Sequence, residues 1–341
     1  MIRMELGSNS YDIVIERGSL KKAKDFLDLN RKVMVITDKG VPSIYAELIA
    51  SQAEEGHIKV VEQGEVSKSL QTAEEILTDM LTYQFSRKDA VVSVGGGVIG
   101  DLGGFVASLY MRGIDFYNVP TTLLSQVDSS IGGKTAVNLA GIKNIVGAFY
   151  QPKKVLIDPD TLSTLDERYV KNGLMEAIKM GATSDKRLFD LFMDGRWNEN
   201  LDAIIEKALL IKKYVVEQDE KENGLRKILN FGHTIGHGFE SAAKGTLLHG
   251  ECVALGMLYM SSESVQEKLK QIYQTIGFQA PDMTSICMED VKEAIVHDKK
   301  AANSQCSVVF VEEIGKGSIE EQPMNSVLSR LEVVPSEKCI W

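Results

Sequence analysis

The sequence predicts an α/β fold, with a Rossmann-like N-terminal domain built on a mostly parallel sheet and a mainly α-helical C-terminal domain. Two observations predict it. Up to about residue 155, short β-branched runs alternate with helical stretches, which is typical of βαβ units. Beyond that point long helical patterns dominate. We therefore expect domains at residues 1–157 and 158–341, with the site in the cleft between them.

Each half has its own expected elements. In the first half, strands are expected at Lys32–Asp38, His57–Gln63, Ala90–Gly97, Asp115–Pro120 and Val155–Asp160. The helices between them are expected near Ile44–Ala53, Leu70–Tyr83 and Gly100–Tyr110. In the second half, helices are expected at Glu167–Lys179, Leu201–Val216, Leu229–Ala242, His249–Leu269 and Met288–Val296, with one late strand at Cys306–Val311. Parallel sheets of this kind bind ligands at the carboxyl ends of their strands.

Composition limits the classes of function. Of 341 residues, 44% are hydrophobic and 25% charged, and the net charge of −10 argues against a nucleic-acid surface. The four cysteines lie in the last third and form no CxxC pair, which favours reduced thiols over a disulfide framework. We find no apolar signal segment and no run of membrane-spanning length. We expect a cytoplasmic protein that binds neither membrane nor nucleic acid.

The stretch from Asn230 to Met257 holds three of the five histidines, His233, His237 and His249. The first two are four residues apart, so a helix would place both on one face, and His249 opens the next apolar stretch. Hydrogen-bonded core histidines at a helix crossing are one interpretation. Because the rest of the chain contains so little histidine, we favour a site for Zn²⁺ or a similar divalent ion.

Glu176 is the candidate acidic ligand. It lies among apolar residues and three positions before Lys179, which by default indicates an ion pair on one helix face. A carboxylate in apolar surroundings needs a partner, and a metal ion is one. Glu176 with His233 and His249 would make a site of two histidines and one glutamate with open positions, although spacing allows either histidine of the pair. The histidine left over would serve in proton transfer or phosphate binding.

Two segments suggest nucleotide binding. Residues 95–104, GGGVIGDLGG, follow a strand and enter a helix, where glycines and free N–H groups suit a pyrophosphate; a tight structural turn is the alternative. The spacing departs from GxGxxG. Asp38, at a strand end, could accept a hydrogen bond from a ribose hydroxyl or could cap a helix.

Polar residues are dense over residues 120–144. Asp128 and Lys134 lie among hydroxyl side chains, and the full P-loop spacing is absent, so ATP binding is not expected. Lys143 and Asn144 follow, with a solvated basic loop as the alternative to a site. Further on, Glu222, Arg226 and Asn230 recur every four residues and would share a face with the histidines if that run were helical, although Gly224 weakens a helix there. Arg is the best clamp for a carboxylate.

Seven segments in order resemble the 3-dehydroquinate synthase family: GGGVIGD, YMRG, PTTLLSQVDSSIGGKT, KNIVGAF, EAIK, GLRKILNFGHTIGHGFE and LHGECVALGM. The similarity runs over nearly the whole chain. It implies a phosphate-eliminating lyase of the shikimate pathway, with recycled NAD and Zn²⁺ or Co²⁺ as cofactors. The implied substrate is a phosphorylated sugar acid, 3-deoxy-D-arabino-heptulosonate 7-phosphate. Oxidation by NAD, phosphate elimination, reduction and an intramolecular aldol closure would yield 3-dehydroquinate. A homodimer is also implied.

The resemblance assigns roles position by position. It makes Glu176, His233 and His249 the metal ligands, which leaves Glu222 and His237 as proton acceptors. The substrate carboxylate would be bound by Lys212 and Arg226, and the sugar hydroxyls by Asp128, Asn172, Lys179 and Asn230. The phosphate would be bound by Lys134, Asn144 and one of Lys299 and Lys300, with Arg112 nearby and reaching across a dimer interface. For NAD the implied residues are Asp38, Glu65, Lys68, Gly96, Gly97, Val98, Asp101, Thr121, Thr122, Lys143, Thr161, Leu162, Ser163 and Thr164.

Three alternative functions fit the sequence less well. Cyclases of the same superfamily that make inosose or valiolone rings use substrates without a carboxylate, and so have no need of Lys212 and Arg226. A metal-dependent polyol dehydrogenase would release NADH and would have no use for phosphate binding by Lys134 and Asn144. A nucleotide-binding regulatory module would not need the metal residues. The pattern therefore favours the dehydroquinate reaction.

Overall fold

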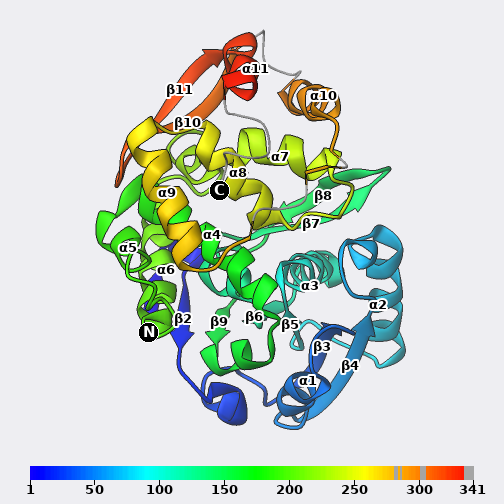
Figure 1. Cartoon of the computed structure of the whole chain (residues 1–341). Coiled ribbons are helices and arrows are strands. Elements are labelled where there is room, and N and C mark those ends of the chain that lie inside the picture. The colour runs from blue at the N-terminus through cyan, green and yellow to red at the C-terminus, as the bar shows by residue number, and fades with distance from the viewer. Residues whose placement is uncertain (280–282, 285, 300–304, 334–341) are drawn as a thin grey trace. The chain divides into compact units, whose positions relative to one another are not determined.

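The structure is a computed structural model that describes residues 1–279, 283–284, 286–299 and 305–333. The chain forms two compact units, Met1–Asp166 and Glu167–Trp341 (Figure 1). The first unit is α/β and the second is mainly helical. Both predicted architectures are confirmed, whereas a site in a cleft between the two domains stays a prediction.

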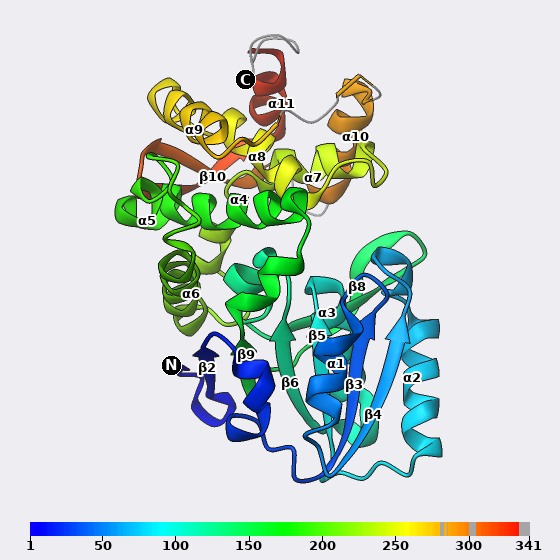
Figure 2. The same cartoon turned by 60° about the horizontal axis from the view of Figure 1, so that its bottom comes forward.

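The first unit is built on a seven-stranded sheet with the order β1-β2-β9-β6-β5-β3-β4 (Figure 2). Its strands are β1 (Ile2–Met4), β2 (Tyr11–Ile15), β3 (Lys32–Asp38), β4 (Glu55–Val61), β5 (Ala90–Gly95), β6 (Asp115–Pro120) and β9 (Lys154–Ile157). All pairs are parallel except β1 with β2. The carboxyl ends of β3, β5 and β6 therefore lie on one edge of the sheet, where ligands of such folds bind.

Helices cover both faces of this sheet. In β3, Val33 and Val35 pack into the cluster that includes α1 (Ser43–Ala50). Met34 and Ile36 of the same strand pack into the cluster with α2 (Leu70–Thr82) and α3 (Gly97–Leu109). Successive side chains of a strand point to opposite faces, so a strand buried on both faces is apolar throughout. This explains why β3 and β5 are continuous apolar runs rather than alternating ones.

Residues 134–149 form a separate two-stranded sheet. Strands β7 (Lys134–Leu139) and β8 (Ile142–Phe149) pair antiparallel across a tight turn, and a bridge from Ser69 to Asn138 joins β7 to the start of α2. Lys143 and Asn144 therefore lie on a strand and not in a loop, but both are exposed, as the alternative of a solvated basic segment expects. The polar segment before β7 contains a π-helical turn, η5 (Ser125–Ser129).

The second unit is mainly helical. Its helices are α4 (Glu167–Ser184), α5 (Lys186–Asp190), α6 (Leu201–Gln218), α7 (His233–Ala242), α8 (His249–Tyr259), α9 (Glu263–Thr275), α10 (Met288–Lys299) and α11 (Met324–Val333). Strand β10 (Gln305–Glu313), predicted as a late strand, pairs antiparallel with β11 (Lys316–Pro323). The second strand was not predicted because its sequence, KGSIEEQP, is polar and poor in β-branched residues.

Two predicted helices are each divided in the structure. The prediction of one helix over 229–242 is wrong, because the 3₁₀ segment η7 (Leu225–Asn230) is separated from α7 by Gly232, whose φ is +77°. The prediction of one helix over 249–269 is also wrong. The chain leaves α8 at Met260, and Ser261 bridges to Val311 of β10 before α9 begins. Tertiary pairing with β10 therefore outweighs the local helical pattern at that point.

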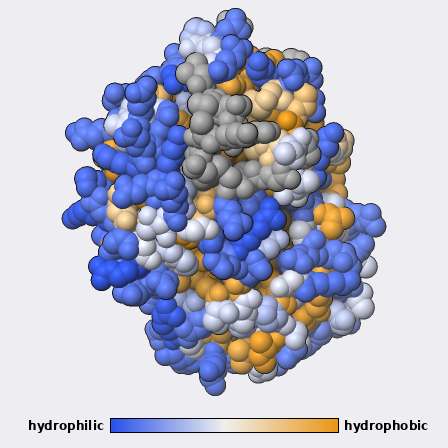
Figure 3. Space-filling view, in the orientation of Figure 1, coloured by the Kyte–Doolittle hydropathy of each residue, from blue (hydrophilic) through white to orange (hydrophobic). Residues whose placement is uncertain are grey.

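Hydrophilic side chains predominate on the face seen in Figure 3, with hydrophobic ones in smaller patches between them. Among the residues that the structure describes, no helix combines the length and apolarity needed to cross a bilayer.

Candidate active site

A buried carboxylate and a buried ammonium lie at the centre of the second unit. Residues 172–183 of α4 are all buried. Within this stretch the side chains of Glu176 and Lys179 are each only 1% exposed, and Nζ of Lys179 donates a hydrogen bond to Oε2 of Glu176. Charges this deep are costly unless they are paired. The Lys179 ammonium therefore stabilises the ionised form of the carboxylate.

Glycines bring α7 and α8 close to one another and to α4. A Cβ on Gly256 would lie 1.9 Å from the carbonyl oxygen of Gly232 and 2.9 Å from the backbone nitrogen of Gly236. A Cβ on Gly250 would lie 2.1 Å from the carbonyl oxygen of Asn172 on α4. No side chain fits at either contact, so the helices meet backbone to backbone. This close approach carries the first residue of each helix toward Glu176.

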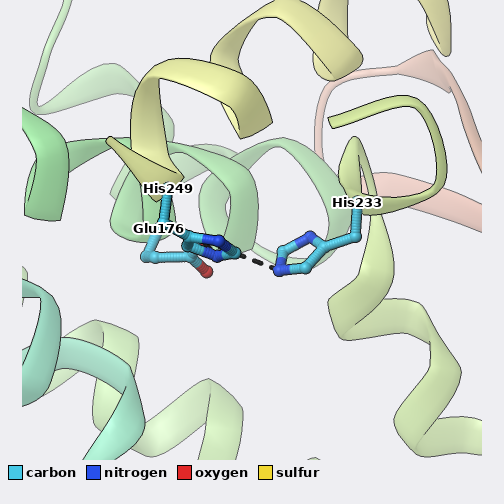
Figure 4. Close-up of side chains that lie close together, drawn as sticks. All are labelled: Glu176, His233 and His249. Atoms are coloured by element: carbon cyan, nitrogen blue, oxygen red, sulfur yellow. Dashed lines mark ion pairs between the residues drawn. The ribbon is translucent and has the colours of Figure 1, made fainter. Parts of the chain in front are cut away.

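The three residues expected to bind metal do meet (Figure 4). Nε2 of His233 lies 3.8 Å from Oε1 of Glu176, and Nε2 of His249 lies 3.5 Å from the same oxygen. Ligand atoms bound at about 2.1 Å to a tetrahedral zinc ion lie about 3.4 Å apart. The spacing therefore fits one divalent ion shared by the three side chains.

Each histidine also has an acceptor at its other ring nitrogen. Nδ1 of His233 lies 3.1 Å from the backbone carbonyl oxygen of Phe231, and Nδ1 of His249 lies 2.9 Å from Oε2 of Glu240. An N–H at Nδ1 donates to these acceptors, so Nε2 of a neutral ring presents its lone pair. Acceptors of this kind are typical of histidines that bind metal.

The two rings differ in their affinity for protons. Burial, together with the positive charge of Lys179, holds the pKa of His233 well below its ordinary value. Burial also opposes charge on His249, but hydrogen bonds and charges from Glu176 and Glu240 raise its pKa to about 10. Without metal at neutral pH, His233 is therefore neutral and His249 is a cation. A divalent ion that binds Nε2 must displace the proton of His249.

His237 lies beside this group, one turn along α7. Its ring centroid is 5.2 Å from that of His233 and 6.0 Å from that of His249, so the prediction that the pair shares a helix face is confirmed. Its ring is exposed, unlike the two others. Ligand atoms of His237, Glu240 and His249 also lie within 4.8 Å of one another. His237 thus lies at the exposed rim of the group.

The run before α7 is not one helical face. Glu222 lies outside any helix, with a φ of +62°, and Gly224 precedes η7. Nδ2 of Asn230 nevertheless donates a 2.8 Å hydrogen bond to Oε1 of Glu222. A turn therefore brings these two together, where the sequence suggested helical spacing. Asp219 organises the turn by accepting hydrogen bonds from the backbone N–H groups of residues 223, 224 and 226.

Three further predicted residues of this unit are buried. Arg226 is 3% exposed and donates a hydrogen bond from Nη1 to the backbone carbonyl oxygen of Glu220. Lys212, on α6, is 6% exposed. Oδ1 of Asn172 accepts a hydrogen bond of 2.5 Å from the backbone N–H of Gly250. Asn172 is thus tied to the start of the helix that carries His249.

In the first unit, the turn from β5 into α3 requires small residues. A Cβ on Gly96 would lie 3.1 Å from Cγ2 of Thr122, and a Cβ on Gly97 would lie 3.0 Å from Oγ of Ser129. The N-terminus of α3, at Gly97 and Val98, follows the sheet edge directly. Its N–H groups are therefore placed to receive an anion.

Lys68 connects two sets of predicted residues. Its Nζ lies 2.6 Å from Oδ2 of Asp101 on α3 and hydrogen-bonds Oδ1 of Asn144 on β8. Asn138 completes the group: its Nδ2 donates to Glu65, and its Oδ1 accepts from the backbone N–H of Asn144. Sequence reasoning assigned Asn144 to phosphate and the others to NAD, and it missed Asn138. Only the β7–β8 pairing places Asn138 there.

Asp38 lies at the carboxyl end of β3 beside an open pocket of 460 Å³. The pocket is lined by Thr37, Asp38, Lys39, Gly40, Val41, Pro42, Ser43 and Val60. Oδ1 of Asp38 accepts a hydrogen bond of 2.8 Å from the backbone N–H of Gly40, and burial raises the pKa of this carboxyl. Asp38 does not cap a helix, because α1 begins after Pro42.

Gln126 joins two predicted NAD segments and was missed by sequence reasoning. Its buried Nε2 donates to the carbonyl oxygens of Pro120 and Asp158 and to Oγ1 of Thr161. The segment that contains Thr121 and Thr122 is thereby tied to the 3₁₀ segment η6 (Pro159–Thr164). Spacing gave no signal for Gln126, since its partners lie far apart along the chain.

The remaining predicted residues are less closely grouped. Lys134 starts β7 and Lys143 lies on β8, while Asp128 lies in η5. Arg112 follows Met111, and both have positive φ values of +70° and +48°. Such strained backbone gathers at functional sites. Lys300, and the side chain of Lys299, lie outside the described residues.

Comparison with known proteins identifies the class of fold. The structure superposes on 2-epi-5-epi-valiolone synthase from Streptomyces hygroscopicus, solved with NAD⁺ and Zn²⁺ bound, with a TM-score of 0.84 at 25% identity over 96% of each chain. It also superposes on 2-deoxy-scyllo-inosose synthase, solved with carbaglucose-6-phosphate, NAD⁺ and Co²⁺, with a TM-score of 0.81 at 24% identity over 97% of this chain and 98% of that one. The fold is that of the sugar-phosphate cyclases.

Sequence comparison identifies the family. Family models described as 3-dehydroquinate synthase N-terminal and C-terminal match residues 58–172 and 173–301. The chain is 41% identical to 3-dehydroquinate synthase of Streptococcus thermophilus, over 97% of this chain and 99% of the relative. It is also 41% identical to that of Enterococcus faecalis, over 96% and 97%. The chain belongs to the 3-dehydroquinate synthase family.

The glycine contact between α7 and α8 can be tested by Gly256→Ala. The added methyl group would overlap the Gly232 carbonyl oxygen, so the helices must separate, at a cost of about 1–3 kcal/mol or more in the free energy of unfolding. Chemical denaturation measures the change. Ser241→Ala, at an exposed position of α7, is the control and should leave stability within about 0.5 kcal/mol. Equal stability of the two variants would contradict the close contact.

Proposed function

We propose that this chain is a 3-dehydroquinate synthase, a lyase that converts 3-deoxy-D-arabino-heptulosonate 7-phosphate to 3-dehydroquinate and orthophosphate. Family membership over nearly the full chain is the observation that carries the proposal. The geometry of Glu176, His233 and His249 supports it, because the reaction requires a divalent ion and these residues fit one.

The proposed metal ligands are Oε1 of Glu176 and Nε2 of His233 and His249, and the ion is Zn²⁺ or Co²⁺. When bound, the ion supplies a Lewis acid that polarises a substrate hydroxyl. The valiolone and inosose synthases that share this fold were solved with Zn²⁺ and Co²⁺. Lys179, which donates to Oε2 of Glu176, orients the carboxylate so that Oε1 faces the histidines.

Proton transfer is assigned to His237 and Glu222. His237 lies beside the metal group and has an exposed ring, so its nitrogen can reach a substrate hydroxyl. The hydrogen bond from Asn230 holds the carboxylate of Glu222 in one orientation. A carboxylate held in this way can accept a proton at its second oxygen.

Substrate contacts are proposed residue by residue. Arg226 and Lys212 are proposed to bind the carboxylate, and the bond from Arg226 to the Glu220 carbonyl fixes the plane of its guanidinium. Phosphate is assigned to Lys134, Asn144, Arg112 and one of Lys299 and Lys300. The sugar hydroxyls are assigned to Asp128, Asn172, Lys179 and Asn230. Recognition of a carboxylate by Arg226 and Lys212 would favour the heptulosonate over sugar phosphates that lack a carboxylate.

NAD is proposed to bind the first unit, where it would accept hydride from the substrate and return it later. Asp38, at the carboxyl end of β3, would bind a ribose hydroxyl in the adjacent pocket. Gly96, Gly97 and Val98 would offer backbone N–H groups to the pyrophosphate. The other proposed contacts are Glu65, Lys68, Asp101, Thr121, Thr122, Lys143, Thr161, Leu162, Ser163 and Thr164.

Phosphate release tests the proposed activity. Purified protein with Co²⁺ or Zn²⁺ and a catalytic amount of NAD⁺ should release orthophosphate from the heptulosonate substrate, without accumulation of NADH. The same assay with glucose 6-phosphate and sedoheptulose 7-phosphate is the control. Turnover of either control sugar, with none of the heptulosonate, would refute the assignment in favour of the other cyclases.

Metal binding tests the proposed ligands. His233→Ala and His249→Ala should each weaken Zn²⁺ binding by more than about 100-fold, because loss of a ligand exceeds the cost of losing an outer contact. His237→Ala, which changes the same residue type on the same helix face, should keep its metal while it loses activity. Titration against a chelating dye measures the affinities. Equal metal loss in all three variants would overturn this choice of ligands.

A homodimer and a cytoplasmic location are also proposed. Hydrophobic side chains gather on the β7–β8 sheet, where Leu139, Ile142, Ile145 and Phe149 are 46%, 58%, 57% and 47% exposed. In the described part of the chain β8 pairs only with β7, so its outer edge is open to another strand. An exposed apolar edge favours self-association.

The cytoplasmic location is supported by the cysteines. Three of the four cysteines are described and all three are free thiols, as expected in a cytoplasm.

The proposed dimer predicts the effect of charge on β8. Ile142→Glu combined with Ile145→Glu should convert the dimer to a monomer, because two carboxylates would be buried in the interface. Light scattering measures the mass. Leu81→Glu, at a leucine of α2 that is 64% exposed and away from this sheet, is the control and should remain dimeric. A dimeric double variant would place the interface elsewhere.

A further inference from the structure

We infer that Glu240 is a positioning residue for the metal site: its carboxylate holds the imidazole of His249 so that Nε2 faces Glu176. This inference rests on the proposed metal site and extends it, since Glu240 itself binds neither metal nor substrate in the proposed function.

The placement of Glu240 follows from α7. Residues 233, 237 and 240 are four and three positions apart, so His233, His237 and Glu240 share one face of the helix. That face is turned toward the start of α8, where Oε2 of Glu240 lies 2.9 Å from Nδ1 of His249. The carboxylate is partly buried, with 19% of its side chain exposed. One helix therefore supplies one metal-facing histidine and the acceptor that orients the other.

The hydrogen bond decides which nitrogen of His249 faces the metal position. A neutral imidazole that donates from Nδ1 presents its lone pair at Nε2, and Nε2 of His249 lies 3.5 Å from Oε1 of Glu176. Without an acceptor at Nδ1, a half-turn of the ring about its bond to Cβ would direct a carbon atom toward Glu176. A charged acceptor also makes the imidazole a stronger electron donor.

Glu240 could instead be a metal ligand, because its oxygen belongs to a second group with His237 and His249. The observed separation of 2.9 Å from Nδ1 of His249 is a normal hydrogen-bond length. It is shorter than the distance of about 3.4 Å between two ligands of one tetrahedral zinc ion. The geometry therefore favours a hydrogen bond over shared coordination.

Glu251 provides a matched comparison. It is a carboxylate two residues after His249 in the chain, and it contacts the backbone: Oε2 accepts from the N–H of Leu248 at the start of α8. It also pairs with Arg168, whose Nε and Nη2 lie 2.6 and 2.8 Å from its two oxygens. Glu251 thus stabilises the helix start without a hydrogen bond to the ring. Removing each carboxylate in turn therefore distinguishes an effect on the orientation of His249 from an effect on the stability of the fold.

The experiment compares Glu240→Ala, Glu240→Gln and Glu251→Ala. Zn²⁺ affinity should fall about 10–100-fold in Glu240→Ala, and less in Glu240→Gln, whose amide oxygen can still accept from Nδ1. The visible absorption of bound Co²⁺ should shift in both Glu240 variants. Glu251→Ala should keep both metal properties but lower the denaturation midpoint of the metal-free protein more than either Glu240 variant does.

Other outcomes overturn the inference. Wild-type affinity and an unchanged Co²⁺ spectrum in Glu240→Ala would show that His249 needs no support. Equal metal loss in Glu251→Ala would show a general loss of structure. Two metal ions per wild-type chain, with one lost in Glu240→Ala, would make Glu240 a ligand. Failure of the wild-type chain to bind either metal would refute the proposed function itself, and is thereby distinguished from failure of this inference.

Discussion

The structure of the second unit depends on the backbone contact between α7 and α8. Because Gly232, Gly236 and Gly256 have no side chains, the two helices approach until carbonyl oxygens and backbone nitrogens are neighbours. His233 and His249 are the first residues of these helices, so the contact also sets the distance between their rings. A methyl group at the crossing would move both. The packing of the two helices therefore also sets the geometry of the proposed metal ligands.

The second unit also compensates a buried negative charge. Glu176 is placed inside the most buried part of α4, and its two oxygens face different partners: Lys179 on one side and the histidines on the other. Such burial makes the carboxylate costly without a cation. Lys179 supplies one positive charge, and protonated His249 supplies another until a metal ion replaces that proton. Because Glu176 is buried, its charge must be balanced by Lys179 together with either the proton of His249 or a metal ion.

In the first unit, the candidate binding residues lie at the carboxyl ends of parallel strands and in the loops that follow them. The turn from β5 into α3 presents a helix N-terminus, and Asp38 ends β3 beside a pocket. Lys68 links α3 to the β7–β8 sheet through Asp101 and Asn144. Asn144, which is proposed to bind phosphate, is therefore a neighbour of Lys68 and Asp101, which are proposed to bind NAD.

Local patterns are sufficient to predict the α/β order and the buried strands, and the rare histidines at short spacing predict the residue types of the metal group. The distances that bring Glu176 to His233 and His249, the contact of Glu240 with the second ring, and the place of Asn138 in the Lys68 group come from the tertiary structure. Those contacts join segments up to 76 residues apart, as from Lys68 to Asn144. Periodicity describes neighbours within one helix or strand, so it carries no information on contacts between segments that lie far apart in the chain. The helix breaks at Gly232 and Ser261 were not predicted, because contacts with distant segments outweigh the local helical preference there.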